Sequence, residues 1–264
     1  MAEFTAKDVQ ALRRATGAGM LDAKRALEAT EGDPEAAAQW LRVQGLAKAV
    51  NRQGRENSEG TVALVLQDNI AAALELRCET DFVAKSAEFL GAAERLAKVL
   101  LLSGEDALAN EQPSLDELKI RLGENISIGK TARLESPPDG VLGVYLHSQN
   151  GRGVNGVIVQ LRGGNPELAH DIAVHIAFAR PRYLSRADVP EDEIAAERST
   201  LTAMARQEGK SEAALEKVVD GRMRGWFKER CLLEQDYVRD EKRTIADLLG
   251  TAEVVTFAQV AIGG

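Results

Sequence analysis

Asp81 and Phe82 stand side by side in the stretch CETDFVAKS, which spans residues 78–86. The stretch joins a strand-like apolar run to a helix-like one, so we expect both side chains at a corner of the chain. A carboxylate at such a corner can cap a helix or take part in acid–base chemistry. A phenyl ring there either folds back into the core or enters another molecule, and the residues alone leave both roles open.

The other residues able to do chemistry are few, with only three histidines in the chain. His170 and His175 are five residues apart on an expected helix, which is a poor spacing for a shared metal ion because residues four apart share a face. No phosphate-binding loop, dinucleotide-binding loop or nucleophile elbow is recognisable. Cys78 and Cys231 form no CxxC pair, which argues against a disulfide framework or a zinc site. We therefore expect no catalytic residue, no cofactor and no metal site, as is typical of a binding protein.

The composition limits the classes of partner. The chain has 264 residues, of which 44% are hydrophobic, and this is enough for more than one compact unit. Its net charge of −8 makes it a poor general binder of phosphate backbones, and its 4% of aromatic residues offer few stacking platforms for bases. No run approaches the roughly 18 apolar residues of a membrane span, and the N-terminus has no signal-peptide pattern. We expect a cytoplasmic protein with no direct nucleic-acid or membrane partner.

Residues 5–48 have the pattern of three short helices. Thr5 with Asp8 resembles a capping box, and the first helix ends at the glycines of TGAG, residues 16–19. Asp33 followed by Pro34 begins the third helix. The apolar positions recur at helical spacing, namely Val9, Leu12, Met20, Ala23, Leu27, Ala37, Trp40 and Leu41. The polar residues 49–59 then indicate a linker between domains.

The apolar period changes after Gly60. The runs TVALVLQ and IAAALELRCE, separated by Asp68 and Asn69, predict a β-hairpin, and helices over 86–102 and 114–122 follow it. A second α+β unit is predicted from a helix over 166–179 and three strand candidates, ISIGKTARLE, GVLGVYLH and GVNGVIVQLR. We assign residues 148–153 to the connection between the last two strands.

Residues 190–230 predict a helical hairpin with a narrow apolar seam, broken at Gly209. The predicted seam consists of Ile194, Leu201, Met204, Leu215, Val218, Val219 and Trp226. A short helix over 244–249 and a last strand, EVVTFAQVAI, come after it. The hairpin is therefore interpreted as an insertion in the second α+β unit.

Taken one at a time, the residues of the corner have ordinary structural explanations. Asp81 could cap the helix that begins near Ser86 or the short turn before it, and capping is the commoner role of a lone aspartate. Phe82 could pack on Phe89, seven residues further along.

The same holds for candidates elsewhere in the chain. Gly17 and Gly19 belong to a turn between two helices, and a methionine such as Met20 is more often a core residue than a contact residue. His147 follows an apolar strand and meets an expected loop, so its default role is that of an ordinary surface histidine.

Several stretches in a fixed order resemble bacterial elongation factor Ts, the nucleotide exchange factor of elongation factor Tu. They are LRRATGAGMLDAKRALEATEGDPEAAAQWLR, TDFVAK, YLH ahead of GVNGVIV, AVHIAFARPRYL, EGKSEAALEKVVDGRM and LLEQDYV. They cover nearly the whole chain, and TGAGM combined with TDFVAK at this separation is specific.

The resemblance implies an α+β multidomain fold. A ubiquitin-associated-like bundle of three helices would occupy residues 1–54, and two similar α+β subdomains would form a core over 55–139 and 140–264. An antiparallel coiled-coil hairpin would be inserted at about 190–230. The residue patterns alone do not reveal the similarity of the two halves.

The resemblance also implies a role for the corner. Asp81 and Phe82 match residues that enter the GTPase elongation factor Tu near its nucleotide-bound Mg²⁺. Thr80 and Val83 would shape the corner, and Lys85 would support it from the helix.

Contacts outside the corner are implied as well. Gly17, Gly19 and Met20 match an N-terminal contact with the partner, and His147 matches a contact from the second subdomain. The expected chemistry is exchange of GDP for GTP without bond breaking. Ser86 stands where the family often has Asn or Asp, a mild change at a capping position.

Two other functions stay open beside this one. A plain ubiquitin-associated-type binding module on an unrelated scaffold predicts that residues 1–54 hold the activity. An enzyme using Asp81 with a histidine predicts turnover of a small substrate without a partner. A homodimer is neither indicated nor excluded by the sequence.

Overall fold

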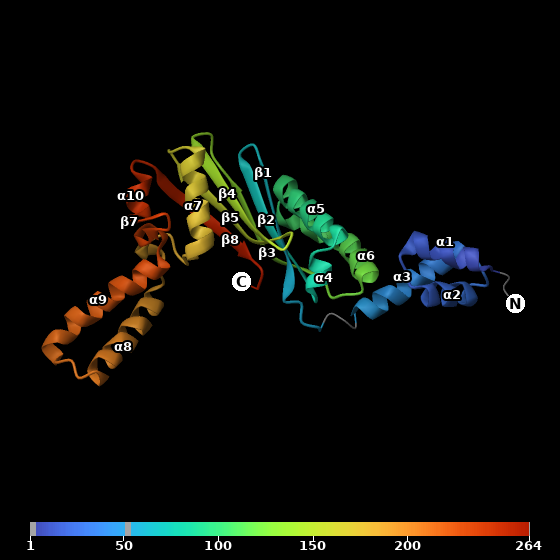
Figure 1. The fold of residues 1–264 in the computed structure, drawn as a ribbon, viewed down its shortest axis with the longest axis horizontal. Coiled ribbons are helices and arrows are strands. Elements are labelled where there is room, and N and C mark those ends of the chain that lie inside the picture. The colour runs from blue at the N-terminus through green and yellow to red at the C-terminus, as the bar shows by residue number, and fades with distance from the viewer. Residues whose placement is uncertain (1–3, 51–53, 264) are drawn as a thin grey trace.

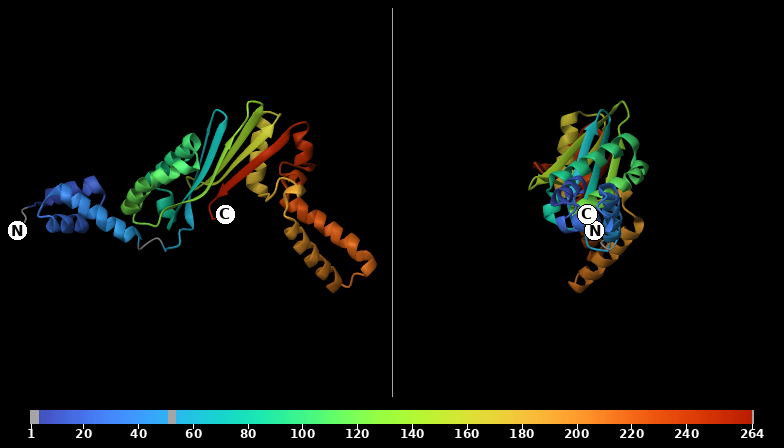
Figure 2. Two further views of the ribbon diagram at one scale, coloured as in Figure 1. Left: turned by 180° about the vertical axis from the view of Figure 1, so that it is seen from behind. Right: turned by 90° about the vertical axis from the view of Figure 1, so that its right-hand side faces the viewer.

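The structure, a computed structural model, describes residues 4–50 and 54–263, with residues 46–50 placed by their backbone alone. Three helices lie at one end of the long axis, two β-sheets with their covering helices lie in the middle, and a pair of long helices projects at the other end (Figures 1 and 2). The mixed helix and sheet class is as predicted.

The N-terminal helices are α1 (Ala6–Thr16), α2 (Met20–Ala29) and α3 (Pro34–Val50). The predicted capping box is confirmed, since Asp8 accepts a hydrogen bond from the backbone N–H of Thr5 at 2.7 Å. Gly17 ends α1 with a φ of 72°, a left-handed conformation that favours glycine. Asp33 begins α3 as predicted, accepting from the N–H groups of Glu35 and Ala36. The core of this bundle consists of Val9, Leu12, Ala23, Ala26, Leu27, Ala37 and Leu41.

The predicted linker over 49–59 is only partly described, because residues 51–53 lie outside the described residues. α3 continues to Val50, and the first strand begins at Glu59. The backbone of Gly45 lies close to Ile120, where a Cβ atom would come within 2.7 Å of the isoleucine side chain. The bundle therefore packs on the body of the protein before the chain enters the sheet.

The first sheet has the order β1–β2–β3, with bounds Glu59–Gln67, Ile70–Cys78 and Ser127–Glu135. The predicted hairpin is confirmed, with Gln67 paired to Ile70 across Asp68 and Asn69. Our grouping of the strand ISIGKTARLE with the second unit is wrong, because β3 pairs with β2 along the first sheet. The intervening segment holds α4 (Asp81–Ala84), α5 (Ala87–Ser103), a 3₁₀ helix over Glu105–Glu111 and α6 (Gln112–Leu122).

The second sheet has the order β4–β5–β8, with bounds Gly140–Gln149, Arg152–Arg162 and Glu253–Ala261. The connection predicted over 148–153 is wrong in length, since Gln149 pairs with Arg152 and only Asn150 and Gly151 make the turn. Both turn residues have positive φ, 53° and 80°, which an Asn-Gly hairpin turn requires. Helix α7 (Pro166–Ala179) follows β5, as predicted.

The two sheets face each other, with α5 against the outer face of the first and α7 against the outer face of the second (Figure 1). Alternate residues of β1 point to opposite faces of the first sheet, so that Ala63 packs toward α5 and Val62 packs toward the second sheet. In β2, Leu74 and Ala73 divide in the same way. Burial on both faces explains why this strand reads as a continuous apolar run.

The projecting helices are α8 (Glu191–Gln207) and α9 (Glu212–Arg230), which pack along each other. Leu201, Leu215, Val219 and Trp226 are buried as predicted. Met204 was predicted in the seam but is 48% exposed, because Ala205 takes the inward position on α8.

The chain returns through β6 (Asp236–Tyr237), β7 (Asp240–Thr244) and α10 (Ile245–Leu249) before β8. At the base of the helix pair, the N–H of Leu232 donates to the carbonyl of Tyr183 at 2.9 Å. A helix with the length and apolar character needed to cross a bilayer is not found among the described residues.

Candidate functional site

The corner at residues 80–85 is built by two successive helix caps. Thr80 has extended backbone and its hydroxyl accepts from the N–H of Val83 at 3.3 Å, which begins α4. Ser86 accepts in the same way from the N–H of Phe89 and begins α5. The predicted capping role of Asp81 is therefore wrong, since the hydroxyl residues on either side of α4 supply the caps.

Phe82 projects into solvent from this one-turn helix. Its side chain is 83% exposed, whereas Phe89 is completely buried, so the predicted packing of one ring on the other is wrong. The inward position of α4 is taken by Ala84, which has no exposed surface. Leaving a phenylalanine in water forgoes roughly 1.5–3 kcal/mol of burial free energy. A ring held outward by a capped turn is available to a partner.

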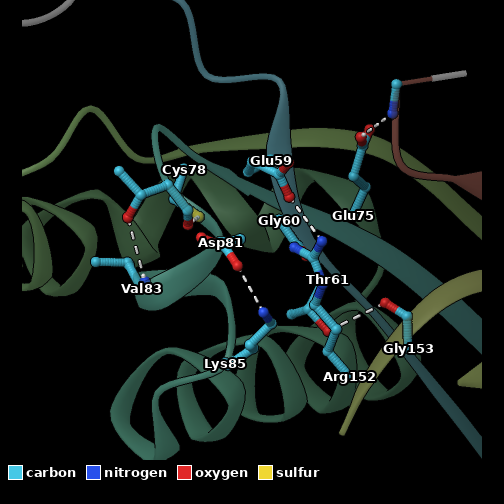
Figure 3. A network of polar contacts seen from close by, with 12 residues as sticks. Glu59, Gly60, Thr61, Glu75, Cys78, Asp81, Val83, Lys85, Arg152 and Gly153 are labelled. Atoms are coloured by element: carbon cyan, nitrogen blue, oxygen red, sulfur yellow. Dashed lines mark hydrogen bonds and ion pairs between the residues drawn. The ribbon is translucent and has the colours of Figure 1, made fainter. Parts of the chain in front are cut away.

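Asp81 and Lys85 form an ion pair across α4, with Oδ2 and Nζ 2.6 Å apart (Figure 3). The hydrogen bond from Lys85 holds the pKa of Asp81 below its ordinary value, and the positive charges of Lys85 and Arg152 act in the same direction. The corner thus presents a charged carboxylate next to an apolar ring.

Arg152 reaches the corner from the second sheet. Its guanidinium donates to Glu59 at 2.6 Å and to the carbonyl of Gly60 at 2.7 Å. Nearby, the hydroxyl of Thr61 donates to the carbonyl of Gly153 at 3.3 Å. Figure 3 shows these contacts beside the Asp81–Lys85 pair. The start of β5 is therefore fixed to the start of β1 at the place where Asp81 lies.

Glu124 supports the corner from the other side, after α6. Its carboxylate accepts from the N–H groups of Glu79 and Thr80 and from the hydroxyl of Thr80. Sequence reasoning missed both Arg152 and Glu124, since neither is near the corner in the chain and no local pattern marks them.

The N-terminal candidates lie at the turn between the first two helices of the bundle, which approaches Arg121 of α6. Gly17 and Gly19 flank the turn between α1 and α2, and Met20 is 49% exposed at the first position of α2. Together with its exposed neighbour Leu21, Met20 borders an apolar hollow that Phe4 and Val9 also line. Met20 is thus a surface residue, contrary to the core role that is commoner for methionine.

His147 lies within β4, paired with Asn155, and not at the start of a loop as predicted. Its side chain is exposed, and Nδ1 lies 3.4 Å from the Tyr145 hydroxyl. It lines a hollow that also includes Glu59, Arg152 and Phe178. The structure thus brings His147 toward the Glu59–Arg152 pair, while Gly17, Gly19 and Met20 belong to the N-terminal bundle, where a Cβ atom at Gly17 would come within 3.4 Å of the Arg121 side chain in α6.

The histidines have their own partners in the described structure, and Asp81 is not among them. His170 Nδ1 lies 2.9 Å from the carbonyl of Val144, and His175 is buried against Gln235. No group of three or more histidine, cysteine or acidic side chains suited to a metal ion occurs within residues 4–50 and 54–263.

Comparison with known proteins identifies the family. The sequence model of the family described as Elongation factor TS matches residues 79–264, a range that begins at the corner. Elongation factor Ts of Clavibacter michiganensis subsp. michiganensis is 42% identical over 278 residues, which cover 100% of both chains. The chain belongs to the elongation factor Ts family.

Other members of the elongation factor Ts family agree over the whole length. Elongation factor Ts of Renibacterium salmoninarum is 40% identical over 280 residues and covers 100% of both chains. That of Acidothermus cellulolyticus is 41% identical over 277 residues, which cover 100% of this chain and 99% of the relative. Elongation factor Ts is a translation factor of protein biosynthesis, a nucleotide exchange factor for elongation factor Tu and not a catalyst of bond making or breaking.

Proposed function

We propose that the chain promotes release of GDP from elongation factor Tu by bringing the corner at residues 80–85 against the partner's nucleotide site. The observation that carries the proposal is the exposure of Phe82 on a capped one-turn helix. Burying this ring between elements of the partner would stabilise the complex by roughly 1.5–3 kcal/mol if it is fully desolvated. Thr80 and Val83 shape the turn that presents it.

Asp81 supplies the electrostatic part of the proposed mechanism. Mg²⁺ bridges and neutralises the phosphate oxygens of a bound nucleotide, so a carboxylate that disturbs the groups and waters around the ion weakens nucleotide binding. The ion pair with Lys85 lowers the pKa of this carboxylate and restrains its position.

The exchange follows from thermodynamic coupling between two ligands of one protein. If this chain lowers the affinity of elongation factor Tu for GDP by some factor, GDP lowers the affinity for this chain by the same factor. The nucleotide-free partner should therefore bind most tightly, and GTP should complete the cycle by displacing the exchange factor.

Further contacts would orient the corner. We assign Gly17, Gly19 and Met20 to an N-terminal contact with the partner, and His147 to a contact from the second sheet. We also assign residues 1–54 to a ubiquitin-associated-like domain and residues 55–139 and 140–264 to two subdomains, with α8 and α9 as a coiled-coil insertion. The exposed side chains of Met20 and His147 support the assignment of these two residues to partner contacts.

A second candidate function is a binding module confined to the N-terminal helices. The apolar hollow beside Met20 and Leu21 favours it, since such a surface can hold a partner without the corner. This alternative requires that residues 1–54 alone retain the activity.

The deciding experiment follows release of a fluorescent GDP analogue from purified elongation factor Tu. The wild-type chain should accelerate release, and the double variant Asp81→Ala/Phe82→Ala should lose most of the acceleration while remaining folded. Equal acceleration by both would move the cause to the N-terminal and His147 contacts. No acceleration by either, with a matched and folded partner, would refute the exchange function and favour the binding module.

A further inference from the structure

The carboxylate of Glu124 collects three hydrogen bonds from the junction that precedes α4. Oε2 accepts from the N–H groups of Glu79 and Thr80 at 3.0 and 3.1 Å. Oε1 accepts from the Thr80 hydroxyl at 2.5 Å. Glu124 comes from the loop after α6, 44 residues further along the chain than Thr80. One side chain thus fixes both the backbone and the hydroxyl of the residue that caps α4.

The Thr80 hydroxyl is the link between Glu124 and the corner. It donates to Glu124 and accepts from the N–H of Val83, so Glu124 fixes the direction of the hydroxyl that caps the helix. A helix of four residues is too short to be stable through its own hydrogen bonds. Its geometry, and with it the direction of Phe82, therefore depends on the cap and on whatever holds the cap.

A second set of bonds holds the same loop in place. Glu79 accepts from the N–H of Asn125 at 2.6 Å, and the side chain of Asn125 donates to the carbonyl of Arg55 at 2.7 Å. Arg55 in turn lies 3.3 Å from the Glu79 carboxylate. The segments 79–80 and 124–125 therefore each bind the backbone of the other, so the support of Glu124 is rigid.

We infer that Glu124 is a positioning residue for nucleotide exchange: it holds α4 so that Phe82 and Asp81 are presented before the partner arrives. This inference rests on the proposed function of the corner. Without Glu124, the N–H groups of Glu79 and Thr80 and the Thr80 hydroxyl would form hydrogen bonds with water instead, and α4 would become more mobile. Ordering the corner would then cost free energy when the complex forms. The loss should appear in exchange, because Phe82 contributes little to the fold.

Replacement by glutamine separates positioning from charge. In Glu124→Gln, the amide oxygen can accept from both N–H groups, and the amide NH₂ can donate to the Thr80 oxygen. The bonds at the junction are then largely kept while the negative charge is removed. Glu124→Ala removes all three bonds, and Thr80→Val removes the linking hydroxyl with little change of shape.

Asp247 provides a matched control. Its carboxylate also accepts from a threonine, with the N–H of Thr244 at 3.0 Å and its hydroxyl at 2.8 Å, but at the start of α10. Asp247→Ala thus removes the same kind of bonds away from the corner. Any effect of general destabilisation should appear in this variant too.

The test measures accelerated release of a fluorescent GDP analogue from purified elongation factor Tu, with exchange factor below saturation. We expect Glu124→Ala and Thr80→Val to slow release on the order of tenfold, the scale of hydrogen bonds to a charged group. Glu124→Gln should stay near wild type, and Asp247→Ala should be unchanged. In a Phe82→Ala background, Glu124→Ala should have little further effect, because coupled residues are non-additive.

Amide hydrogen exchange at Val83 in the free protein gives a readout that needs no partner. It should speed up in Glu124→Ala and Thr80→Val but not in Asp247→Ala. Should Glu124→Ala fail to fold, the comparison of Thr80→Val with Glu124→Gln decides. Wild-type release in Thr80→Val and Glu124→Ala, or equal losses in Glu124→Gln and Glu124→Ala, would overturn the inference while Phe82→Ala still impairs release. If Phe82→Ala leaves release unchanged, it is the proposed function of the corner that fails.

Discussion

The ammonium group of Lys85 lies 2.6 Å from the carboxylate of Asp81, one helical turn earlier in the chain. Lys85 ends the one-turn helix α4 that Asp81 begins, so the pair spans the whole element that carries Phe82. The acidic residue of the corner therefore reaches a partner already accompanied by a positive charge.

Replacing Lys85 should raise the pKa of Asp81. In Lys85→Met, the carboxylate loses the hydrogen bond that is the main cause of its lowered pKa, and the pKa should move up toward the ordinary value of an aspartate. An NMR titration of the Asp81 carboxyl carbon measures the change. Lys98→Met, on the exposed side of α5, is the control and should leave the Asp81 titration as it is.

The lowered pKa of Asp81 also determines how its contribution to the stability of the fold changes with pH. A carboxylate that binds its proton less readily when folded stabilises the fold above its unfolded pKa, and this contribution disappears as the pH falls through the folded pKa. The pair is therefore intact at neutral pH. A Lys85→Met variant whose Asp81 titrates as in wild type would show that Lys85 does not cause the shift.

Phe82→Ala should separate exchange from stability. With the ring exposed, its removal should change the free energy of unfolding by no more than about 0.5 kcal/mol while strongly reducing GDP release. Phe89→Ala, a truncation of the buried ring at the start of α5, should instead cost about 3–5 kcal/mol. Urea denaturation and the nucleotide release assay on both variants measure the contrast. A comparable loss of stability in both would mean that Phe82 packs on the body of the protein.

His175 should make stability fall as the pH drops below about 6.5, the ordinary pKa of histidine. Burial lowers its pKa, and its Nδ1 accepts from the N–H of Val238 while Nε2 lies 2.9 Å from Gln235. A second proton would place two N–H groups face to face. Below about pH 6.5 the His175 imidazole is protonated in the unfolded chain but stays neutral in the folded protein. The free energy of unfolding therefore decreases as the pH falls toward the folded pKa. Thermal unfolding across this range measures the slope, and His175→Gln should flatten it. An equal slope in both proteins would assign the effect to other groups.

Gly143→Ala should destabilise the second sheet and its helix. A Cβ atom at Gly143 would lie 2.2 Å from the backbone of Ala169 in α7, so helix and sheet would have to separate, at about 1–3 kcal/mol. Gly91→Ala is the matched control, since a Cβ there meets nothing within 4 Å on the exposed side of α5. That change should stabilise the protein by roughly 0.5–1 kcal/mol. Chemical denaturation of both variants tests the difference, and a stable Gly143→Ala protein would contradict the close packing.

Much of the secondary structure could be predicted from short-range sequence patterns. The capping box at Thr5, the helix start at Asp33 and the hairpin across Asp68 and Asn69 each depend on neighbouring residues, and each prediction was right. The pairing of β3 with β2 could not be predicted this way, because it joins strands separated by the whole of α4, α5 and α6. The Asn150–Gly151 turn had a readable signal that we assigned to a longer loop.

The site was predicted to a smaller extent. The residues alone left the role of Phe82 open between core packing and entry into another molecule, and the packing alternative and the capping role of Asp81 are wrong, since Phe82 is exposed and Asp81 caps no helix. The supports from Glu124 and Arg152 depend on tertiary contacts between distant segments. Such contacts leave no periodic trace in a single sequence.

The helix pair α8 and α9 leaves and re-enters the body of the protein at nearly the same point. Tyr183 and Cys231 form a parallel bridge there, and the N–H of Leu233 donates to the carbonyl of Leu184 at 3.1 Å. The segments before α8 and after α9 are thus hydrogen-bonded to each other at the base of the helix pair, independently of its tip. Evolution can lengthen or shorten such an arm by whole turns without disturbing the register of β5 and β8, and a protein engineer could graft a different arm at the same two residues.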